Sequence, residues 1–354
     1  MELYPSLITD ALRTVRYPGT GKNIVDMGIV ADDLRIAGLH VSFTMVFDRP
    51  TDPFLRSLVK AAEAAIHAHV SHDITVEIAT RTATAGSPEA PAAPDYSHLG
   101  RIIAVSSGKG GVGKSTVAVN LAVSLAAQGF RVGLLDCDIY GPSVPKMLGI
   151  EDARPYSEER DGKTLIVPVE ACGLKVISIG FFVDTATPTL WRGGMATGAL
   201  KQLIGEVAWG ELDYFVLDTP PGTSDIHLTL VQTLPIAGAL IVTTPQQVAL
   251  ADARKGMHMY TNEKINIPIL GIVENMAWFT PAEHPAERYY IFGRDAATTL
   301  ALEEHTPLLA QIPLVAGMSE EADAGRPAVN GTSEPTAQAF ASLAATIAAM
   351  LPTP

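Results

Sequence analysis

Cysteine is scarce in this sequence: its 354 residues include only two, Cys137 and Cys172. Two cysteines are too few for the disulfide framework of a small secreted protein. The sequence also has no run of about 18 or more apolar residues that is free of charged and turn-forming residues, so we expect no membrane span. Its first residues lack the basic start, apolar stretch and cleavage site of a secretory signal. Together these absences favour a cytoplasmic protein.

Positive charge is limited as well. The chain has 25 lysines and arginines against 38 aspartates and glutamates, a formal net charge of −13. Proteins that bind nucleic acids broadly neutralise phosphates with basic side chains, and this acidic chain is poorly suited to that task. We therefore expect neither nucleic acid nor a membrane among its partners.

Composition along the chain predicts two domains joined by a linker. Residues 81–100, "RTATAGSPEAPAAPDYSHLG", are rich in Ala and Pro and poor in large apolar side chains. That composition is typical of a semi-extended linker, although an ordered surface loop also fits. In residues 1–80, helical patterns and two alternating strand patterns, "LHVSFTMVF" and "DITVEIAT", predict a small α+β domain.

Residues 101–354 have a different pattern, in which short apolar runs are separated by helical segments. Continuous apolar strands of this kind predict an α/β fold, with a mostly parallel sheet covered by helices on both faces. The runs are "RIIAVSS", "RVGLLD", "LKVISIG", "DYFVLD", "GALIVTT" and "PILGIVEN". The predicted helices include "STVAVNLAVSLAAQG", "QVALADARKGMHMYTNE" and the C-terminal "PTAQAFASLAATIAAML".

The stretch "GKGGVGKS" matches the phosphate-binding pattern G-x-x-x-x-G-K-[ST]. It follows a predicted strand and opens a predicted helix, which is the context of the P-loop NTPase fold. Glycines let the loop point its N–H groups at phosphate oxygens, and the helix N-terminus adds its dipole. Lys114 is expected to bind the β- and γ-phosphates, Ser115 to bind Mg²⁺, and Thr116 to help hold the α-phosphate. The predicted nucleotide-binding residues of the loop are Gly108, Lys109, Gly110, Gly111, Val112, Gly113, Lys114, Ser115 and Thr116.

Two further stretches supply acidic groups. In "DYFVLDTPPGTSD", Asp218 ends an apolar strand and is expected to hold the water shell of Mg²⁺; the rigid turn after it places Gly222 as a sensor of the γ-phosphate. In "LLDCDIYGPS", Asp136 and Asp138 follow the strand after the P-loop helix, at the edge of the sheet that borders the nucleotide. We expect Asp138 to orient the attacking water and Asp136 to anchor the turn. Helix capping remains the alternative role for these aspartates.

Six motifs, in order, closely resemble the Mrp/ApbC family of ATPases that carry iron–sulfur clusters. They are "KGGVGKST", "LLDCDIYGPSVP", "WRGGMATGAL", "DYFVLDTPPGTSD", "VTTPQQVALADARKG" and "GIVENMAWF". The resemblance covers nearly everything from Arg101 onward, and residues 1–80 are similar to the cluster-assembly domain often fused ahead of that ATPase. It implies an ATPase that uses ATP and Mg²⁺, and partners that are apoprotein acceptors or other cluster-assembly proteins.

This family belongs to the deviant Walker A ATPases, a group that includes MinD, ParA and the nitrogenase iron protein. The resemblance implies a homodimer in which Lys109 reaches the nucleotide of the other subunit and neutralises the transferring phosphoryl group. It also implies that Asp138 is the water-orienting acid of switch I and that Asn275, in "GIVENM", recognises adenine. Hydrolysis should be slow without a partner, because closure of the dimer is part of the switch.

One part of the sequence departs from the family pattern. The resemblance implies a Cys-x-x-Cys pair about ten residues after "VENM", yet "MAWFTPAEHPAERYYIFG", from Met276 to Gly293, contains no cysteine. Ligation of an iron–sulfur cluster by the usual thiolates is therefore excluded. Glu283 and His284 are a poor match for a cluster. Carboxylates beside Cys137 should raise its thiol pKa, and Cys172 is expected to be a small core residue.

Three functions compete on this sequence. The motifs favour an ATPase that serves iron–sulfur cluster carriage or assembly. A positioning or switch ATPase of the MinD/ParA type would need a basic amphipathic C-terminal helix or a basic DNA-binding face, and the tail "PTAQAFASLAATIAAMLPTP" has no Lys or Arg. An ATP-dependent synthetase on the same fold would need a substrate pocket, for which no motif is evident.

Overall fold

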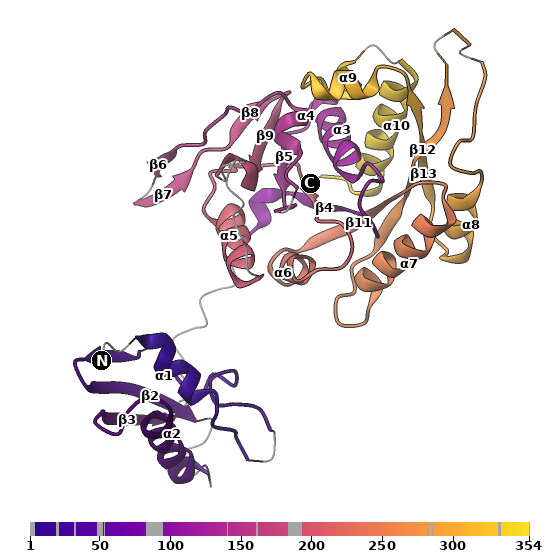
Figure 1. Ribbon diagram of the computed structural model, residues 1–354. Coiled ribbons are helices and arrows are strands. Elements are labelled where there is room, and N and C mark those ends of the chain that lie inside the picture. Colours follow the sequence, from indigo (N-terminus) through magenta and orange to yellow (C-terminus); the bar gives the residue numbers. More distant parts are fainter. Residues whose placement is uncertain are drawn as a thin grey trace. The chain divides into compact units, whose positions relative to one another are not determined.

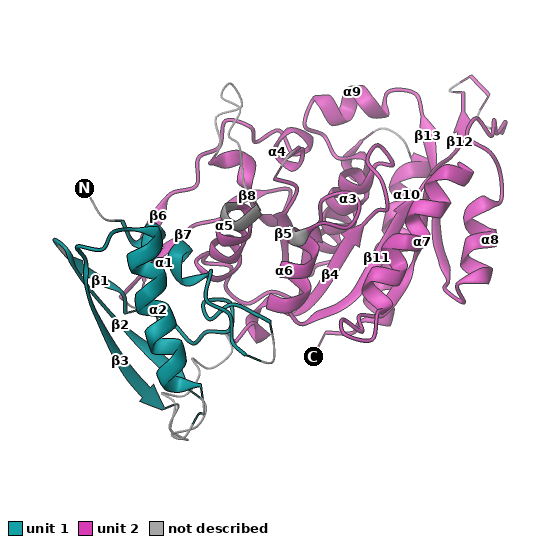
Figure 2. Cartoon of the chain, turned by 60° about the horizontal axis from the view of Figure 1, so that its bottom comes forward, with its two compact units in different colours: residues 1–93 teal, residues 94–354 magenta. Residues whose placement is uncertain are grey.

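The computed structural model describes residues 4–18, 21–31, 33–47, 52, 54–82, 95–139, 141–160, 162–182, 193–281, 283–284, 286–331 and 334–353. The chain divides into two compact units, Met1–Ala93 and Pro94–Pro354, which Figure 2 shows in two colours. Each unit has its own hydrophobic core and is described by itself.

The first unit is a small α+β fold, as predicted. Its three-stranded sheet has the order β1-β2-β3, in which β1 pairs antiparallel and β3 parallel with β2. The parallel pairing follows from the helical crossover through α2. Every second residue of β2, from Val41 to Phe47, is buried in a core shared with both helices. The elements are α1 (Pro5–Leu12), β1 (Arg35–Ala37), β2 (His40–Phe47), α2 (Leu55–His69) and β3 (Thr75–Thr82).

The second unit is built on an eight-stranded sheet with the order β13-β12-β11-β4-β10-β5-β9-β8. Every pairing is parallel except that of the edge strand β8 with β9. The six apolar runs predict six of these strands, and β8 and β13 are additional. Their bounds are β4 (Arg101–Ser106), β5 (Val132–Asp136), β8 (Val169–Ala171), β9 (Leu174–Ser178), β10 (Tyr214–Asp218), β11 (Ile236–Thr243), β12 (Ile269–Thr280) and β13 (Leu308–Val315).

Helices cover both faces of this sheet, which confirms the predicted α/β class. Figure 1 shows α3 and α10 on one face and α5, α6, α7 and α8 on the other, and a separate apolar core lies under each layer. In the described part of the chain, no helix combines the length and apolar character that a membrane crossing needs. The helices are α3 (Lys114–Ala127), α4 (Val144–Met147), α5 (Gly193–Gly205), α6 (Asp225–Thr233), α7 (Gln247–Thr261), α8 (Ala296–Glu303), α9 (Met318–Asp323) and α10 (Glu334–Met350). Smaller elements are the hairpin of β6 (Ser157–Arg160) and β7 (Lys163–Ile166), and the 3₁₀ turns η1 (Ser97–Leu99), η2 (Ile179–Phe181) and η3 (Ala328–Asn330).

The ends of the predicted linker, residues 81–100, belong to ordered elements. β3 continues to Thr82, and η1 places Leu99 in the core of the second unit with no exposed surface. Residues 83–94 lie outside the described residues. Burial of the Leu99 side chain in this core explains why the end of the predicted linker is ordered, although the residues before it are polar.

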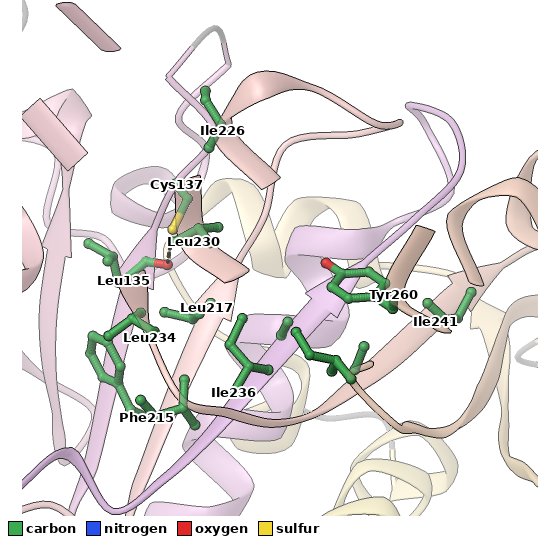
Figure 3. Packing of buried hydrophobic residues seen from close by; sticks show 14 of the residues in the cluster. Leu135, Cys137, Phe215, Leu217, Ile226, Leu230, Leu234, Ile236, Ile241 and Tyr260 are labelled. Atoms are coloured by element: carbon green, nitrogen blue, oxygen red, sulfur yellow. Dashed lines mark hydrogen bonds between the residues drawn. The ribbon is translucent and has the colours of Figure 1, made fainter. Parts of the chain in front are cut away.

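The two cysteines have opposite environments. Cys137 follows β5 and points into the core among Leu135, Leu217 and Leu230, where its thiol donates to the Leu135 carbonyl at 3.7 Å (Figure 3). Cys172 is exposed, which corrects the expectation of a core residue. It occupies the turn between β8 and β9 with φ +50°, followed by Gly173 at φ +77°, and a two-residue hairpin turn of this type leaves its side chains outside the sheet.

Candidate nucleotide-binding site

The loop between β4 and α3 has the conformation that a phosphate needs. Gly111 and Gly113 both have φ +80°, a region that other residues rarely adopt. A β-carbon on Gly113 would come within 2.1 Å of the Asn275 amide nitrogen, and one on Gly108 within 2.0 Å of the Asp252 backbone on α7. The glycines therefore allow the loop to pack between β12 and α7 while its centre, at Gly110 and Gly111, stays exposed.

This loop forms one side of a cavity of about 200 Å³. Most of the loop residues predicted to bind nucleotide line it, and so does Asp138. Val112 and Gly108 do not, because Val112 is buried in the core and Gly108 packs against α7. Four lining residues have no counterpart in the sequence prediction: Ser107, Ser143, Met147 and Pro221. The full lining is Ser107, Lys109, Gly110, Gly111, Gly113, Lys114, Ser115, Thr116, Asp138, Ser143, Met147 and Pro221.

Lys114 and Asp218 form a buried ion pair at the base of the cavity. The Lys114 ammonium donates to Asp218 Oδ1 at 2.5 Å and to the Ser115 hydroxyl at 3.2 Å, and the two charged side chains are 6% and 0% exposed. The second carboxylate oxygen of Asp218, Oδ2, is buried and has no hydrogen-bond partner in the described part of the chain. Burial raises the pKa of Asp218, while Lys114 acts against that rise. An ammonium, a hydroxyl and a buried carboxylate thus lie close together, although Asp218 itself does not line the cavity.

Asp136 lies beside this pair, opposite Asp218 in the register of β5 and β10. Burial, followed by the neighbouring Asp218, raises the pKa of Asp136 to about 8. Its Oδ1 accepts from the Asp138 backbone N–H at 3.0 Å, and its Oδ2 accepts from the Ser178 hydroxyl at 3.0 Å. Asp136 therefore anchors the turn that carries Asp138, as the sequence suggests.

The turn after β10 is fastened to the P-loop by hydrogen bonds. The backbone N–H and hydroxyl of Thr219 donate to the Val105 carbonyl at 3.1 and 3.0 Å. The Gly222 N–H donates to the Ser107 carbonyl at 2.8 Å, and Gly222 has φ +77°. These bonds connect the turn to the residues just before the P-loop, and the sensor role of Gly222 stays a prediction.

His227, on α6, supports the same turn and was missed by the sequence analysis. Its Nδ1 accepts from the Ser224 backbone N–H at 3.1 Å, and the side chain is 1% exposed. Burial, with a smaller contribution from Lys114, lowers the pKa of His227 to about 4, so the ring is neutral near pH 7. The only sequence signal is a histidine three residues after a helix-capping serine, which is weak.

Lys109 and Asn275 make contacts with their own chain. The Lys109 ammonium donates to Gln246 Oε1 at 3.2 Å, and the Lys109 carbonyl accepts from the Ser107 hydroxyl at 2.9 Å. Asn275 is 5% exposed, and its amide nitrogen donates to the Val112 carbonyl at 2.9 Å. Asn275 thus stabilises the loop through its Val112 carbonyl, and its role in adenine recognition stays a prediction.

In the cysteine-free segment after Asn275, the end of β12 pairs antiparallel with the chain that follows it, at Phe279 and Tyr289. Phe279 and Tyr289 exchange two backbone hydrogen bonds of 2.8 and 2.9 Å, and the Arg288 guanidinium lies 4.2 Å from the centre of the Trp278 ring. His284 lies 3.7 Å from Glu287. Among the described residues, no group of three or more His, Cys, Asp or Glu side chains is placed to hold a metal ion. Aromatic and charged contacts therefore lie where the family pattern places its Cys-x-x-Cys pair.

Two family models match the chain. The model described as ParA, NUBPL iron-transfer P-loop NTPase, matches residues 98–348, and the model described as iron-sulfur cluster assembly protein matches residues 6–78. The chain is 43% identical over 350 residues to an iron-sulfur cluster carrier protein of Synechocystis sp., with 97% of each chain covered. It is 40% identical over 343 residues to the protein of that name in Deinococcus radiodurans, covering 96% of this chain and 94% of the other.

Solved structures agree on the fold. A nucleotide-binding protein of Archaeoglobus fulgidus in complex with ADP is 38% identical and superposes with a TM-score of 0.59, covering 69% of this chain and 93% of that one. The cell division ATPase MinD of Pyrococcus furiosus is 25% identical, with a TM-score of 0.51 and coverage of 71% and 100%. The chain therefore belongs to the iron–sulfur cluster carrier family of P-loop ATPases.

Proposed function

We propose that this chain binds and hydrolyses ATP–Mg²⁺ in a homodimer and serves the delivery or assembly of iron–sulfur clusters, without holding a cluster through the usual cysteine pair. The observation that carries the proposal is a P-loop with two lysines in different surroundings. Lys114 is buried against Asp218, whereas Lys109 is partly exposed and bonds to Gln246, just before α7. Only one of them is placed at the base of the phosphate cavity.

The residues at the base of the cavity fit ATP and Mg²⁺. Loop N–H groups and Lys114 offer donors to phosphate oxygens, and a bound phosphate would compete with Asp218 for the Lys114 ammonium. The unpartnered Oδ2 of Asp218 and the Ser115 hydroxyl are hard oxygen donors, which Mg²⁺ and its water shell prefer. Bound Mg²⁺ would neutralise phosphate charge as the γ-phosphoryl group leaves.

Exchange of the Lys114 partner also couples the nucleotide to the turn after β10. Asp218 ends the strand that leads into this turn, and Gly222 is bonded to the loop itself. When Lys114 moves from Asp218 to phosphate, the charge balance of the buried carboxylates Asp136 and Asp218 changes. A γ-phosphate can thereby alter the turn, which is the switch behaviour typical of this fold.

Asp138 and Lys109 are the proposed groups for hydrolysis. Asp138 lines the cavity, with its backbone fixed by Asp136, and can accept a hydrogen bond from the attacking water. Lys109 is proposed to neutralise the transferring phosphoryl group of the partner subunit, as an arginine finger does. Each active site then needs Asp138 from one subunit and Lys109 from the other.

Mixing two inactive variants tests this arrangement. Lys109→Ala and Asp138→Asn chains should each hydrolyse ATP slowly, but a heterodimer has one site with both groups intact. With free exchange of an equimolar mixture, half of the dimers are mixed and half of their sites work, so turnover should reach about one quarter of the wild-type rate per chain. Steady-state ATPase rates of the separate and mixed proteins measure this.

Subunit exchange is controlled in the same samples. Cys172 is exposed and Cys137 is buried, so maleimide dyes attached to Cys172 report exchange by energy transfer. A mixture that exchanges and yet shows no rise in ATPase rate would mean that Lys109 acts within its own subunit or not at all.

The cluster itself does not fit the residues present. Cys137 is fully buried, and burial, with Asp136 and Asp218 beside it, raises its thiol pKa well above the usual value, which disfavours the thiolate that iron needs. Burial also raises the pKa of Cys172, which is exposed on a hairpin turn. The proposed role in cluster delivery or assembly therefore rests on the relatives. A cluster would be bound jointly by this chain and a partner protein, or by ligands other than cysteine.

Iron retention tests the cysteines directly. We expect anaerobically reconstituted wild type, Cys137→Ala and Cys172→Ser to keep the same low iron content after gel filtration, because neither thiol is a ligand. Iron, sulfide and nucleotide are measured on one preparation of each. About four irons per dimer in the wild type, lost in either variant, would show that the chain carries its own cluster.

The same preparations address the alternative, a positioning ATPase that has no part in cluster chemistry. The described part of α10 has no basic residue in its last turn, which gives no support to a membrane-binding tail. If ATP does not change the transfer of a cluster from an assembly protein to an apoprotein acceptor, the positioning role becomes the better reading.

A further inference from the structure

Among the residues that the structure describes, the Lys109 side chain is held by the bond from its ammonium to Gln246 Oε1 at 3.2 Å. Gln246 comes just before α7, and its carbonyl accepts from the backbone N–H groups of Ala249 and Leu250 at 2.9 and 3.2 Å. The base of Gln246 is therefore fixed by the first turn of the helix. Both side chains are partly exposed, so their bond can open without breaking the core.

The other end of this contact is equally well anchored. The Lys109 carbonyl accepts from Ser107, and the preceding Gly108 packs so tightly on Asp252 of α7 that no β-carbon fits between them. The loop and the start of α7 therefore keep one relative position. Only the flexible Lys109 side chain has to turn for its ammonium to leave Gln246.

We propose that Gln246 is a positioning residue that holds the Lys109 ammonium in its own subunit until a partner subunit with bound nucleotide takes it over. The inference rests on the proposed role of Lys109 across the dimer. Within one chain the ammonium is bonded to Gln246, so reaching the partner's phosphates requires that this bond be exchanged. Gln246 thereby opposes the pairing that hydrolysis needs, because its bond to Lys109 must break first.

The residue type at this position matters for the exchange. A neutral amide oxygen binds an ammonium more weakly than a carboxylate does, and a phosphate with its negative charge can displace it. A carboxylate at the same place would form an ion pair with Lys109 and cancel its charge. Glutamine thus provides a bond that is strong enough to order the Lys109 side chain and weak enough to be replaced by a phosphate.

Two substitutions and a neighbouring control test the inference. Gln246→Glu should lower kcat about fivefold, with the KM for ATP within about twofold of wild type, because a partly exposed ion pair of this kind is modest in strength and the P-loop is untouched. Gln246→Leu removes the acceptor, so pairing no longer has to break this bond, and half-maximal turnover should be reached at a lower protein concentration than in wild type. Gln247→Glu adds the same charge at the next, exposed residue and should leave kcat unchanged.

The same substitutions on a Lys109→Ala background decide whether Gln246 acts through Lys109. Without the lysine, Gln246→Glu should lower kcat no further, whereas a structural or long-range charge effect would persist. The inference is overturned if Gln246→Glu matches Gln247→Glu, or if its full effect remains in Lys109→Ala. If Lys109→Ala alone turns over like wild type, the proposed role of Lys109 fails, and the inference about Gln246 fails with it.

Discussion

Lys114→Ala is expected to lose ATP binding by about 100-fold or more, because it removes the one buried ammonium at the phosphate cavity of the described chain. Titration with a fluorescent ATP analogue measures the affinity. In the nucleotide-free protein Lys114 also balances Asp218, and breaking a buried pair by removing one partner costs about 3–5 kcal/mol of folding stability. Binding and stability should therefore both fall.

Two further variants separate these effects. Lys114→Gln keeps a donor for Asp218 without the charge, so it should be closer to wild type in thermal stability and still bind ATP poorly. Lys264→Ala removes an exposed lysine outside the site and should change neither property. Wild-type affinity in a folded Lys114→Gln protein would rule out the P-loop as the nucleotide site.

The sequence predicts the central part of the sheet well because its signals are local. The runs that become β4, β5, β10 and β11 are apolar throughout, as strands buried on both faces must be. Their carboxyl ends carry the loop, Asp136, Asp138 and Asp218, so the neighbourhood of these groups follows from a parallel sheet. The local pattern does not predict which side chains bond to each other, since the Lys114–Asp218 bond joins residues that are 104 positions apart.

The edges of the sheet were harder to predict for a physical reason. β13 is interrupted by Pro313 and preceded by Pro307, and it is only partly buried, so its pattern is mixed. β8 is three residues long and pairs antiparallel at the edge. The expectation that Cys172 lies in the core is wrong for the same reason, because a strand this short gives no sign of the hairpin turn that follows it.

Contacts made by polar side chains were the least predictable part of the site. Gln246 lies within the motif "VTTPQQVALADARKG", which assigns it no contact, and His227 has only a weak capping signal; the importance of both comes from the groups that folding brings to them. Asn275 shows the opposite case. The motif suggests contact with the base, whereas the described contact is with the Val112 carbonyl behind the loop.

Asp138→Asn is expected to lower kcat at saturating ATP by about 100-fold or more, the usual contribution of a positioned acid–base group. Asparagine has the same shape, and the backbone N–H of residue 138 still donates to Asp136, so the turn should keep its place. ATP affinity should stay the same or tighten, because a neutral side chain repels phosphate less than a carboxylate does. A single-turnover measurement with pre-bound ATP separates the chemical step from binding and release.

Asp152→Asn, an exposed substitution outside the cavity, is the matched control and should leave the rate unchanged. The pattern of loss distinguishes Asp138 from the rest of the site. Lys114→Ala should fail in binding, whereas Asp138→Asn should bind ATP and stall before hydrolysis. If ATP holds the proposed dimer together, a stalled chain is also expected to stay paired with its partner, since its γ-phosphate is not removed. If Asp138→Asn hydrolyses ATP at the wild-type rate, the water is oriented by another group, and the quarter-rate recovery expected from mixed dimers loses its basis.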